Sequence, residues 1–335
     1  MKLRQIYEMA IQMGIEKDVR GEAEIKRLLE TRKKEYDKSE GAGRAAFDLD
    51  TLFNPFADSR ILNGTGNEEI KSILCGIDME IGELVLADRL REKGRRIDLV
   101  LAHHPEGSAQ AALADVMGLQ ADQLFREGIP INVAESILSS RISEVERGMH
   151  PLNHQRAVDA ARLLDLPFMC LHTPADNQVN DFLEKHLAAA APVTMDDLME
   201  TMCSLPEYEK ARTLKAGPRI LVGDKKKRTG KLFIKMTGGT SGSSDVYAKM
   251  ETAGIGTVIC MHMTEKHLEN AKRHNINVVV AGHMASDSLG LNLILDRLEE
   301  QGIEIIPCSG LIRVSRCNVR KAGKSGRGNA GAKTK

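Results

Sequence analysis

Residues 72–105, SILCGIDMEIGELVLADRLREKGRRIDLVLAHHP, decide the fold class of this chain. The apolar run at 72–79 predicts a strand, and the segment 82–94 predicts a helix that ends at Gly94, since glycine commonly follows the last residue of a helix. The run at 96–105 predicts a second strand, which ends in two histidines. A strand, a helix and a strand in so short a span form a βαβ unit, whose two strands are parallel.

Similar apolar runs continue to the end of the chain and alternate with helical patterns. The runs lie at 167–173, 218–223, 231–239, 256–262, 276–283 and 303–310. The helical patterns lie near 108–127, 153–165, 244–253, 264–273 and 288–301. The predicted fold class is therefore α/β, with α+β as the alternative. The polar stretch 223–231 has turn residues at both ends and predicts a hairpin between the runs on either side of it.

The composition is that of a globular protein with a basic end. The chain has 335 residues, of which 42% are hydrophobic and 28% charged, so it can bury the cores of two domains. Aromatic residues make up only 3%, too few for stacking platforms that bind single-stranded nucleic acid. Residues 313–335 contain eight Lys and Arg and no acid, which leaves 39 basic against 47 acidic residues in the rest. We therefore expect no nucleic-acid partner, and we expect 317–335 to be disordered because it cannot bury enough apolar surface.

The sequence predicts a cytoplasmic protein without a membrane span. No stretch approaches the ~20 apolar residues that a transmembrane helix needs, and Glu8 interrupts the apolar region that a signal peptide would need. The six cysteines are scattered without a CxxC pair, which indicates neither a zinc ribbon nor a disulfide framework. Residues 1–50 predict an amphipathic helical extension that packs on the body or on a second subunit.

Histidines and carboxylates follow the predicted strands, at the end of an α/β sheet where ligands bind. The residues concerned are His103, His104, His172, Asp176, His262, His283 and Asp287. Imidazole nitrogen and carboxylate oxygen are ligands that a borderline divalent ion prefers. If a helix begins near 283, His283 and Asp287 lie on one face, and the carboxylate could bridge two ions. Hydrogen-bonded or surface histidines are the alternative interpretation of these positions.

Four stretches, in this order, resemble the motifs of the Nif-three-like family of dinuclear metal-centre proteins. They are DLVLAHHP (98–105), LHTPADNQVNDFL (171–183), KMTGGTSGSSDV (235–246) and NVVVAGHMASDSLGLNLILDRL (277–298). The resemblance covers about residues 57–312. Carried over residue by residue, it implies His103 and His283 on one metal ion, His104 and Asp176 on the other, and Asp287 shared between them.

The resemblance also implies a fold, a cofactor, an activity and an assembly. The fold would be two α/β domains that face a metal-binding cleft, and the cofactor would be two divalent ions such as Zn, Fe or Mn. Family members commonly form rings of subunits, so we expect a homo-oligomer. Some members are described as GTP cyclohydrolases of a second type, which implies a nucleotide as the small-molecule substrate.

The chain departs from the family pattern around the site. Asp287 stands where the family usually has Glu, which shortens the carboxylate's reach by about 1.5 Å, against metal–oxygen bonds of about 2.1 Å. Residues 105–165 hold an insertion, and Cys260-Met261-His262 replaces a Thr-Gly-Glu/Asp turn. The turn TGGTSG (237–242) could present backbone N–H groups to an anion, or its glycines could serve close packing alone.

We therefore expect a metal-dependent hydrolase of a nucleotide or related small molecule, with a non-catalytic metal-binding or regulatory protein as the alternative. His172 and His262 are the candidates for proton transfer, and Asp181 is a candidate for orienting one of them. The predicted organisation has four parts. These are a helical extension at 1–50, a first α/β domain at 51–130 plus 275–316, a second at 131–274 with the insertion, and the basic tail at 317–335.

Overall fold

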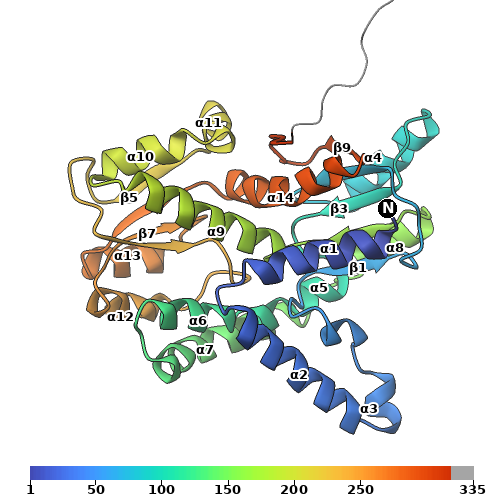
Figure 1. The fold of residues 1–335 in the computed structure, drawn as a ribbon, viewed down its shortest axis with the longest axis horizontal. Helices are drawn as coiled ribbons and strands as arrows, with labels where there is room; N and C mark the ends of the chain where they lie inside the picture. Colours follow the sequence, from blue (N-terminus) through green and yellow to red (C-terminus); the bar gives the residue numbers. More distant parts are fainter. Residues whose placement is uncertain (318–335) are drawn as a thin grey trace, which may run out of the picture.

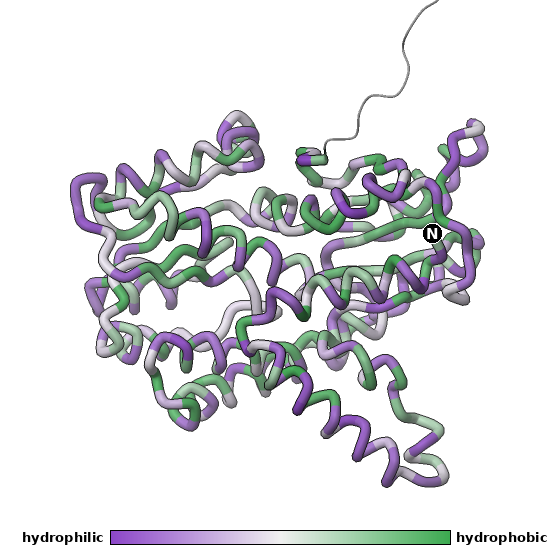
Figure 2. The backbone as a smooth tube through the Cα atoms, viewed as in Figure 1, coloured by the Kyte–Doolittle hydropathy of each residue, from purple (hydrophilic) through white to green (hydrophobic). Residues whose placement is uncertain are grey.

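The computed structural model describes residues 1–317, so the predicted disordered tail lies outside the described residues except for Cys317. Two β-sheets, each flanked by helices, make up the described chain (Figure 1). The predicted α/β class is therefore confirmed. Most strand residues are apolar along the whole strand (Figure 2), as expected where helices cover both faces of a parallel sheet.

The first sheet contains the predicted βαβ unit. Its strands are β1 (Arg60–Asn63), β2 (Ser72–Gly76), β3 (Leu99–Ala102), β4 (Phe168–Cys170) and β9 (Glu304–Pro307), in the order β1-β4-β3-β2-β9. Helix α4 (Ile81–Glu92) connects β2 to β3, and these two strands are parallel. Strands β4 and β9 also run parallel to their neighbours, and only the edge strand β1 is antiparallel. The carboxyl ends of β3 and β4 consequently lie side by side.

The second sheet has the order β5-β8-β7-β6, and its strands are β5 (Arg219–Val222), β6 (Lys231–Lys235), β7 (Ile255–Cys260) and β8 (Asn277–Val280). The hairpin predicted at 223–231 is wrong, because β5 and β6 lie at opposite edges of this sheet. The segment between them instead runs past the start of helix α10 (Met195–Cys203). There the carbonyls of Lys227 and Lys225 accept the first two N–H groups of the helix, which have no partner within it.

Helices α9 (Thr173–Ala190) and α14 (His283–Glu300) pack against each other and join the two cores. The N-terminal part of α9 contributes Ala175 to the core of the first sheet, and its later turns contribute to the core of the second. Helix α14 does the reverse, with Leu289 in the second core and Leu291 in the first. Gly290 permits their close approach, because a Cβ there would lie 2.2 Å from the carbonyl oxygen of Ala175.

The insertion at 105–165 is helical and contacts both sheets. It contains α5 (Gly107–Ala111), η2 (Leu113–Val116), α6 (Leu119–Arg126), α7 (Ile131–Met149) and α8 (Arg156–Leu163). Helix α8 packs on α4 and β1, whereas α6 and α7 share a core with β6 and β7 of the second sheet. The single helical pattern near 108–127 is thus divided among α5, η2 and α6.

The N-terminal region has an integrated part and a projecting part. Helix α1 (Leu3–Glu16) buries Leu3, Ile6 and Tyr7 in the core of the first sheet and packs on α9. Helices α2 (Glu22–Lys38) and α3 (Gly41–Ala45) extend away from the body (Figure 1), and α2 buries only Ile25. The remaining elements are η1 (Leu49–Leu52), α11 (Pro206–Thr213), η3 (Ser244–Val246), α12 (Tyr247–Thr252) and α13 (Glu265–Arg273).

Two strands lie in a different sheet from the one that the predicted boundaries imply. Strand β4, which the boundary at 131 assigns to the second domain, pairs with β3 in the first sheet. Strand β8, which the segment 275–316 assigns to the first domain, pairs with β7 in the second sheet. Apolar runs of this kind do not indicate which strands will pair. The inserted helices also separate β4 from β3 in the sequence, so the pairing of these two strands could not be predicted from their spacing. In residues 1–317, no helix combines the length and the apolar character that crossing a membrane requires.

Candidate metal centre

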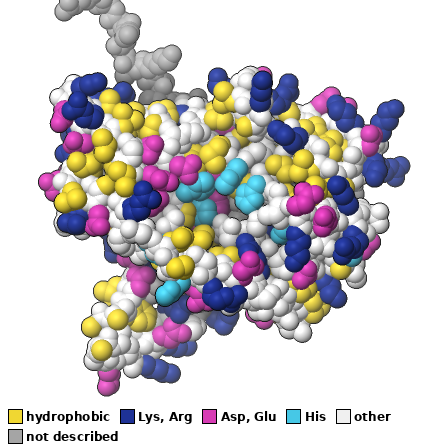
Figure 3. Space-filling view, turned by 180° about the vertical axis from the view of Figure 1, so that it is seen from behind, with side chains coloured by type: hydrophobic (Ala, Val, Ile, Leu, Met, Phe, Trp, Pro, Cys, Tyr) yellow, Lys and Arg dark blue, Asp and Glu magenta, His cyan; other side chains and the backbone are white. Residues whose placement is uncertain are grey.

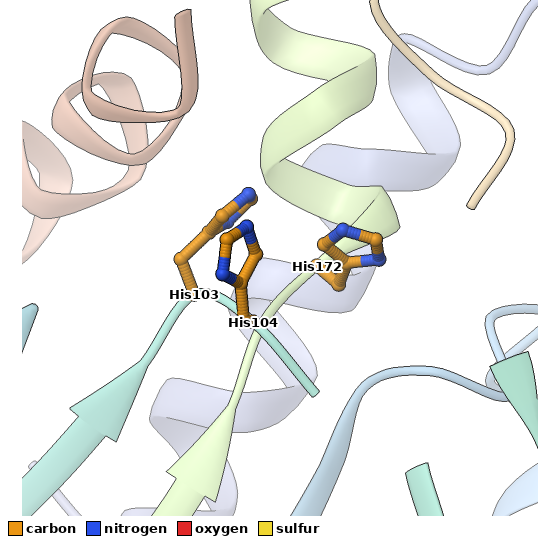
Figure 4. A group of neighbouring side chains, drawn as sticks. All are labelled: His103, His104 and His172. Carbon is orange, nitrogen blue, oxygen red and sulfur yellow. The ribbon is translucent and has the colours of Figure 1, made fainter. Parts of the chain in front are cut away.

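Six of the predicted side chains converge where helices α9 and α14 meet the first sheet. His103 and His104 follow the last residue of β3, and His172 caps the start of α9 two residues after β4 (Figure 4). Asp176 lies in the first turn of α9, and His283 and Asp287 lie on one face at the start of α14. A group of histidines occupies a hollow on this side of the molecule (Figure 3).

Hydrogen bonds on the outer side of three imidazoles fix their orientation. The Nδ1 atom of His103 lies 3.0 Å from the carbonyl oxygen of Leu171, and that of His104 lies 2.6 Å from Oδ1 of Asp78. The Nδ1 atom of His172 lies 2.8 Å from Oδ2 of the fully buried Asp58. Since each of these acceptors requires an N–H at Nδ1, Nε2 is the atom of each ring that remains for a metal ion, and it carries a lone pair when the ring is neutral. This is the arrangement that fixes histidines as metal ligands.

The inward atoms of the cluster have no hydrogen-bond partner among residues 1–317. They are Nε2 of His103, Oδ1 of Asp176 and both carboxylate oxygens of Asp287, all of them buried. His103 Nε2 lies 3.5 Å from Oδ1 of Asp287, whereas Oδ2 of Asp287 lies 3.4 Å from His104 Nε2 and 3.5 Å from His283 Nε2. Buried polar atoms are nearly always hydrogen-bonded, so this set requires an explanation.

The spacing of these atoms fits a metal ion. Ligand atoms about 2.0–2.1 Å from a tetrahedral zinc ion lie about 3.3 Å from one another, close to the separations in this cluster. The donor set of imidazole nitrogen and carboxylate oxygen is also one that Zn, Fe and Mn accept. The residues present could therefore hold a metal ion.

The ligand atoms divide into overlapping groups. One group is His104, His283 and Asp287, and a second is His103, Asp176 and Asp287. The geometry thus places His283 with His104, whereas the resemblance paired His283 with His103. Asp287 belongs to both groups and offers a different oxygen to each, as expected of a shared carboxylate. A third group, His103, His104 and His172, brings His172 into the cluster as a further candidate ligand.

Charge and burial shift the pKa values of this cluster in opposite directions. Burial raises the pKa of Asp176 to about 8. Burial also favours the neutral form of Asp287, but the adjacent His103 and His104 outweigh it and hold the pKa of Asp287 well below its usual range. Burial lowers the pKa of His283 to about 4. For His172, burial is outweighed by Asp176 and Asp58, which raise its pKa to about 9.

Two further residues predicted for the site, His262 and Asp181, lie outside the ligand groups. His262 follows β7 and contacts the ring of His283, with centroids 5.0 Å apart, but it belongs to none of the ligand groups. The carboxylate of Asp181 pairs with Lys17 and Lys185, so the expected orienting role is wrong for this residue. Asp58 and Asp78 orient histidines instead. Neither aspartate could be recognised from the sequence, because each lies far along the chain from the ring that it contacts.

The fold and the cluster define a class: a two-sheet α/β protein whose strand ends and paired helices form a site that could hold metal ions. Among solved structures, the chain is similar to a NIF3 superfamily protein from Sphaerobacter thermophilus. The two share 26% sequence identity with a TM-score of 0.69, over 85% of this chain and 98% of that one. The chain thus has the fold of the NIF3 superfamily, and the resemblance seen in its motifs is confirmed.

More distant structures also match. HcgD from Methanocaldococcus jannaschii, in a reduced form, is 14% identical with a TM-score of 0.48, over 74% of this chain and 87% of that one. TTHA1606 from Thermus thermophilus is 12% identical with a TM-score of 0.43, over 74% of this chain and 86% of that one. No protein-family model and no curated protein matches the chain.

Proposed function

We propose that this chain binds two divalent metal ions at His103, His104, Asp176, His283 and Asp287 and is a metal-dependent hydrolase of a small molecule. The observation that carries the proposal is a set of buried atoms without hydrogen-bond partners among residues 1–317, namely Nε2 of His103, Oδ1 of Asp176 and both carboxylate oxygens of Asp287. Nε2 of His103 lies 3.5 Å from Oδ1 of each carboxylate. Oδ2 of Asp287 lies 3.4 Å from Nε2 of His104 and 3.5 Å from Nε2 of His283. Without a cation between them, these atoms would lose hydrogen bonds to water and gain none.

The protein holds these ligands on rigid elements. When bound, divalent ions supply Lewis acidity and lower the pKa of a coordinated water. Asp78, Asp58 and the Leu171 carbonyl hold the histidine rings at fixed angles, which lowers the cost of assembling the site. The side chain of His283 is 37% exposed, so that edge of the cluster is open to a substrate.

Two histidines are candidates for proton transfer near the centre. His172 donates from Nδ1 to Asp58, and its Nε2 lies 3.8 Å from Oδ2 of Asp176. His262 lines a pocket together with His172, Asp176 and His283, and its Nδ1 is 3.5 Å from the hydroxyl of Ser241. We propose His262 as the proton-transfer residue on the substrate side, because His172 is also a candidate metal ligand. The family resemblance makes a nucleotide, with a GTP cyclohydrolase-like reaction, the substrate class to test first.

The test separates a hydrolase from a metal-binding protein without activity. The protein is purified without added metal, its metal content is measured by elemental analysis, and hydrolysis of a panel of nucleotides is followed. A hydrolase should contain divalent metal and turn over at least one substrate, and His262→Ala should lower turnover while metal content stays the same. Metal without turnover would favour the non-catalytic alternative, and absence of metal would contradict the proposal as a whole.

A further inference from the structure

A lysine with no ion-pair partner lines the pocket beside the metal centre. Lys235 is the last residue of β6 and is partly buried. The pocket that it lines also includes His172, Asp176 and His283 of the cluster, together with His262. Among residues 1–317, no carboxylate lies within ion-pair distance of its ammonium group. Its titratable neighbours are Arg141, the neutral thiol of Cys260 and the imidazoles of His262 and His267. Burial lowers the pKa of Lys235, as it does for an ammonium group that lacks a counterion.

The loop that follows β6 is held by side chains that contact its carbonyl groups. Gln120 of α6 donates from Nε2 to the carbonyl oxygens of Gly238 and Thr240, at 2.6 and 2.8 Å. Arg141 of α7 donates to the carbonyl of Ser241 at 3.0 Å, and Nε2 of His267 lies 3.2 Å from the carbonyl oxygen of Gly242. Four carbonyl acceptors of the loop are thus engaged by helices α6, α7 and α13.

These contacts determine where the N–H groups of the loop point. In a trans peptide unit the C=O and N–H bonds point in opposite directions. The N–H groups of Gly239 and Ser241 therefore point away from Gln120, and neither donates a hydrogen bond to a residue within 1–317. Gly239, Thr240 and Ser241 line the same pocket as Lys235. Free backbone N–H groups that converge in a turn are a common binding site for an anion.

Close packing explains the glycines of the loop but not its free donors. A Cβ at Gly238 would lie 2.5 Å from Cγ of Gln120, and one at Gly239 would lie 2.8 Å from Cγ2 of Val116. Both glycines also have positive φ, 103° and 79°. These constraints fix the residue type at 238 and 239. They leave open why an unpaired ammonium group and two unpaired N–H groups line one pocket.

We propose that Lys235 and the backbone N–H groups of Gly239 and Ser241 bind the phosphate group of the substrate, next to the metal centre. An oxyanion there would pair with the ammonium group and accept hydrogen bonds from the loop, which satisfies both sets of donors. The subsite would place the rest of the substrate toward His283 and the cluster. The position of the reacting group rests on the proposed function, whereas the phosphate contact itself requires only Lys235 and the loop.

The experiment measures binding of inorganic phosphate by calorimetry, with acetate as a second ligand at equal ionic strength. The proteins are the wild type, Lys235→Met, the charge-retaining Lys235→Arg, and the control Lys231→Met. Lys231 is four residues earlier on the same strand and pairs with Glu127, so its substitution removes the same charge away from the pocket. Each protein is measured with its metal and after chelation, and metal content is recorded.

We expect Lys235→Met to weaken phosphate binding by about 10- to 100-fold, the effect of losing a hydrogen bond to a charged group. Lys235→Arg should retain most of the binding, Lys231→Met should match the wild type, and the lysine-dependent difference should persist after chelation. Equal phosphate binding in Lys235→Met and the wild type, or no phosphate binding by the wild type, would overturn the subsite. Acetate bound as tightly as phosphate would replace the phosphate assignment with a carboxylate. Absence of metal in the wild type would refute the proposed function alone, because the chelated measurement still decides the subsite.

Discussion

Replacement of Asp287 by Ala should remove both metal ions, whereas replacement of His283 by Ala should remove one. Asp287 is 1% exposed, and its two oxygens face different ligand groups. His283 belongs to one group only. If the site is dinuclear, the metal content should fall from ~2 ions per chain to ~1 in His283→Ala and well below 1 in Asp287→Ala, since both cations then lack the anion between them.

The size of the effect can be bounded. Substituting a residue that merely orients a ligand costs 10- to 100-fold in metal affinity, so loss of a shared ligand should cost more than about 100-fold. A ligand present at 1,000 times its dissociation constant stabilises a protein by ~4 kcal/mol, or roughly 6 °C in a chain of this size. Added metal should therefore raise the melting temperature of the wild type by several degrees and leave that of Asp287→Ala nearly unchanged.

Elemental analysis and differential scanning calorimetry, with and without metal, provide the measurement. The competing explanation is that the carboxylate of Asp287 only interacts favourably with the positive end of the dipole of helix α14 and binds no metal. That explanation is weak, because Asp287 is the fifth residue of the helix and the dipole effect is confined to the first turn. Full metal occupancy in Asp287→Ala, together with a wild-type thermal response to metal, would refute our reasoning.

Four other results are expected. Asp78→Ala should weaken metal binding by about 10- to 100-fold and leave the fold intact, because the side chain of Asp78 is 55% exposed but orients His104; an unchanged dissociation constant would show that this contact is irrelevant. Gly290→Ala should destabilise the protein by about 1–3 kcal/mol in urea unfolding, because its methyl group would collide with the Ala175 carbonyl, and no loss of stability would mean that α9 and α14 can separate freely. Metal affinity should rise with pH up to about 8 in competition with a chelator, because the raised pKa of Asp176 means that the metal must displace a proton below that pH; a flat profile would contradict this assignment. We also propose that the chain forms a homo-oligomer, and light scattering that gives a mass near the 36.8 kDa of one chain would exclude it.

The sequence predicted the local structure near the site better than the arrangement of distant parts. The strands at 72–79 and 96–105 appear as β2 and β3, because their apolar runs and the helix between them form one local unit. Helix α9 was not predicted, although Pro174 near its start is a common feature of helix N-termini. Strand β1 escaped detection because it has four residues at a sheet edge, and three of them are only partly buried.

The candidate ligands lie directly after a strand or in the first turns of a helix, so local sequence patterns located them. Their mutual distances could not be obtained in this way. His104 lies with His283 rather than with Asp176 because of how α14 crosses α9, and that crossing depends on Gly290 and on the packing of both cores. Asp58, Asp78 and Lys235 reach the site through contacts between segments far apart in the chain, which no spacing rule relates to one another.

The crossing of α9 and α14 also determines when the set of candidate ligands becomes complete during synthesis. The chain emerges from the ribosome with its N-terminus first, and early segments begin to fold before later ones emerge. His103, His104 and Asp176 emerge well before α14, whose Gly290 must settle against Ala175 before His283 and Asp287 face them. A nascent chain therefore offers an incomplete and weaker set of ligands until nearly the whole protein has been made. If the proposed centre binds metal, its loading is thus a late step of biogenesis, and a truncated or stalled product would lack the ligands that α14 supplies.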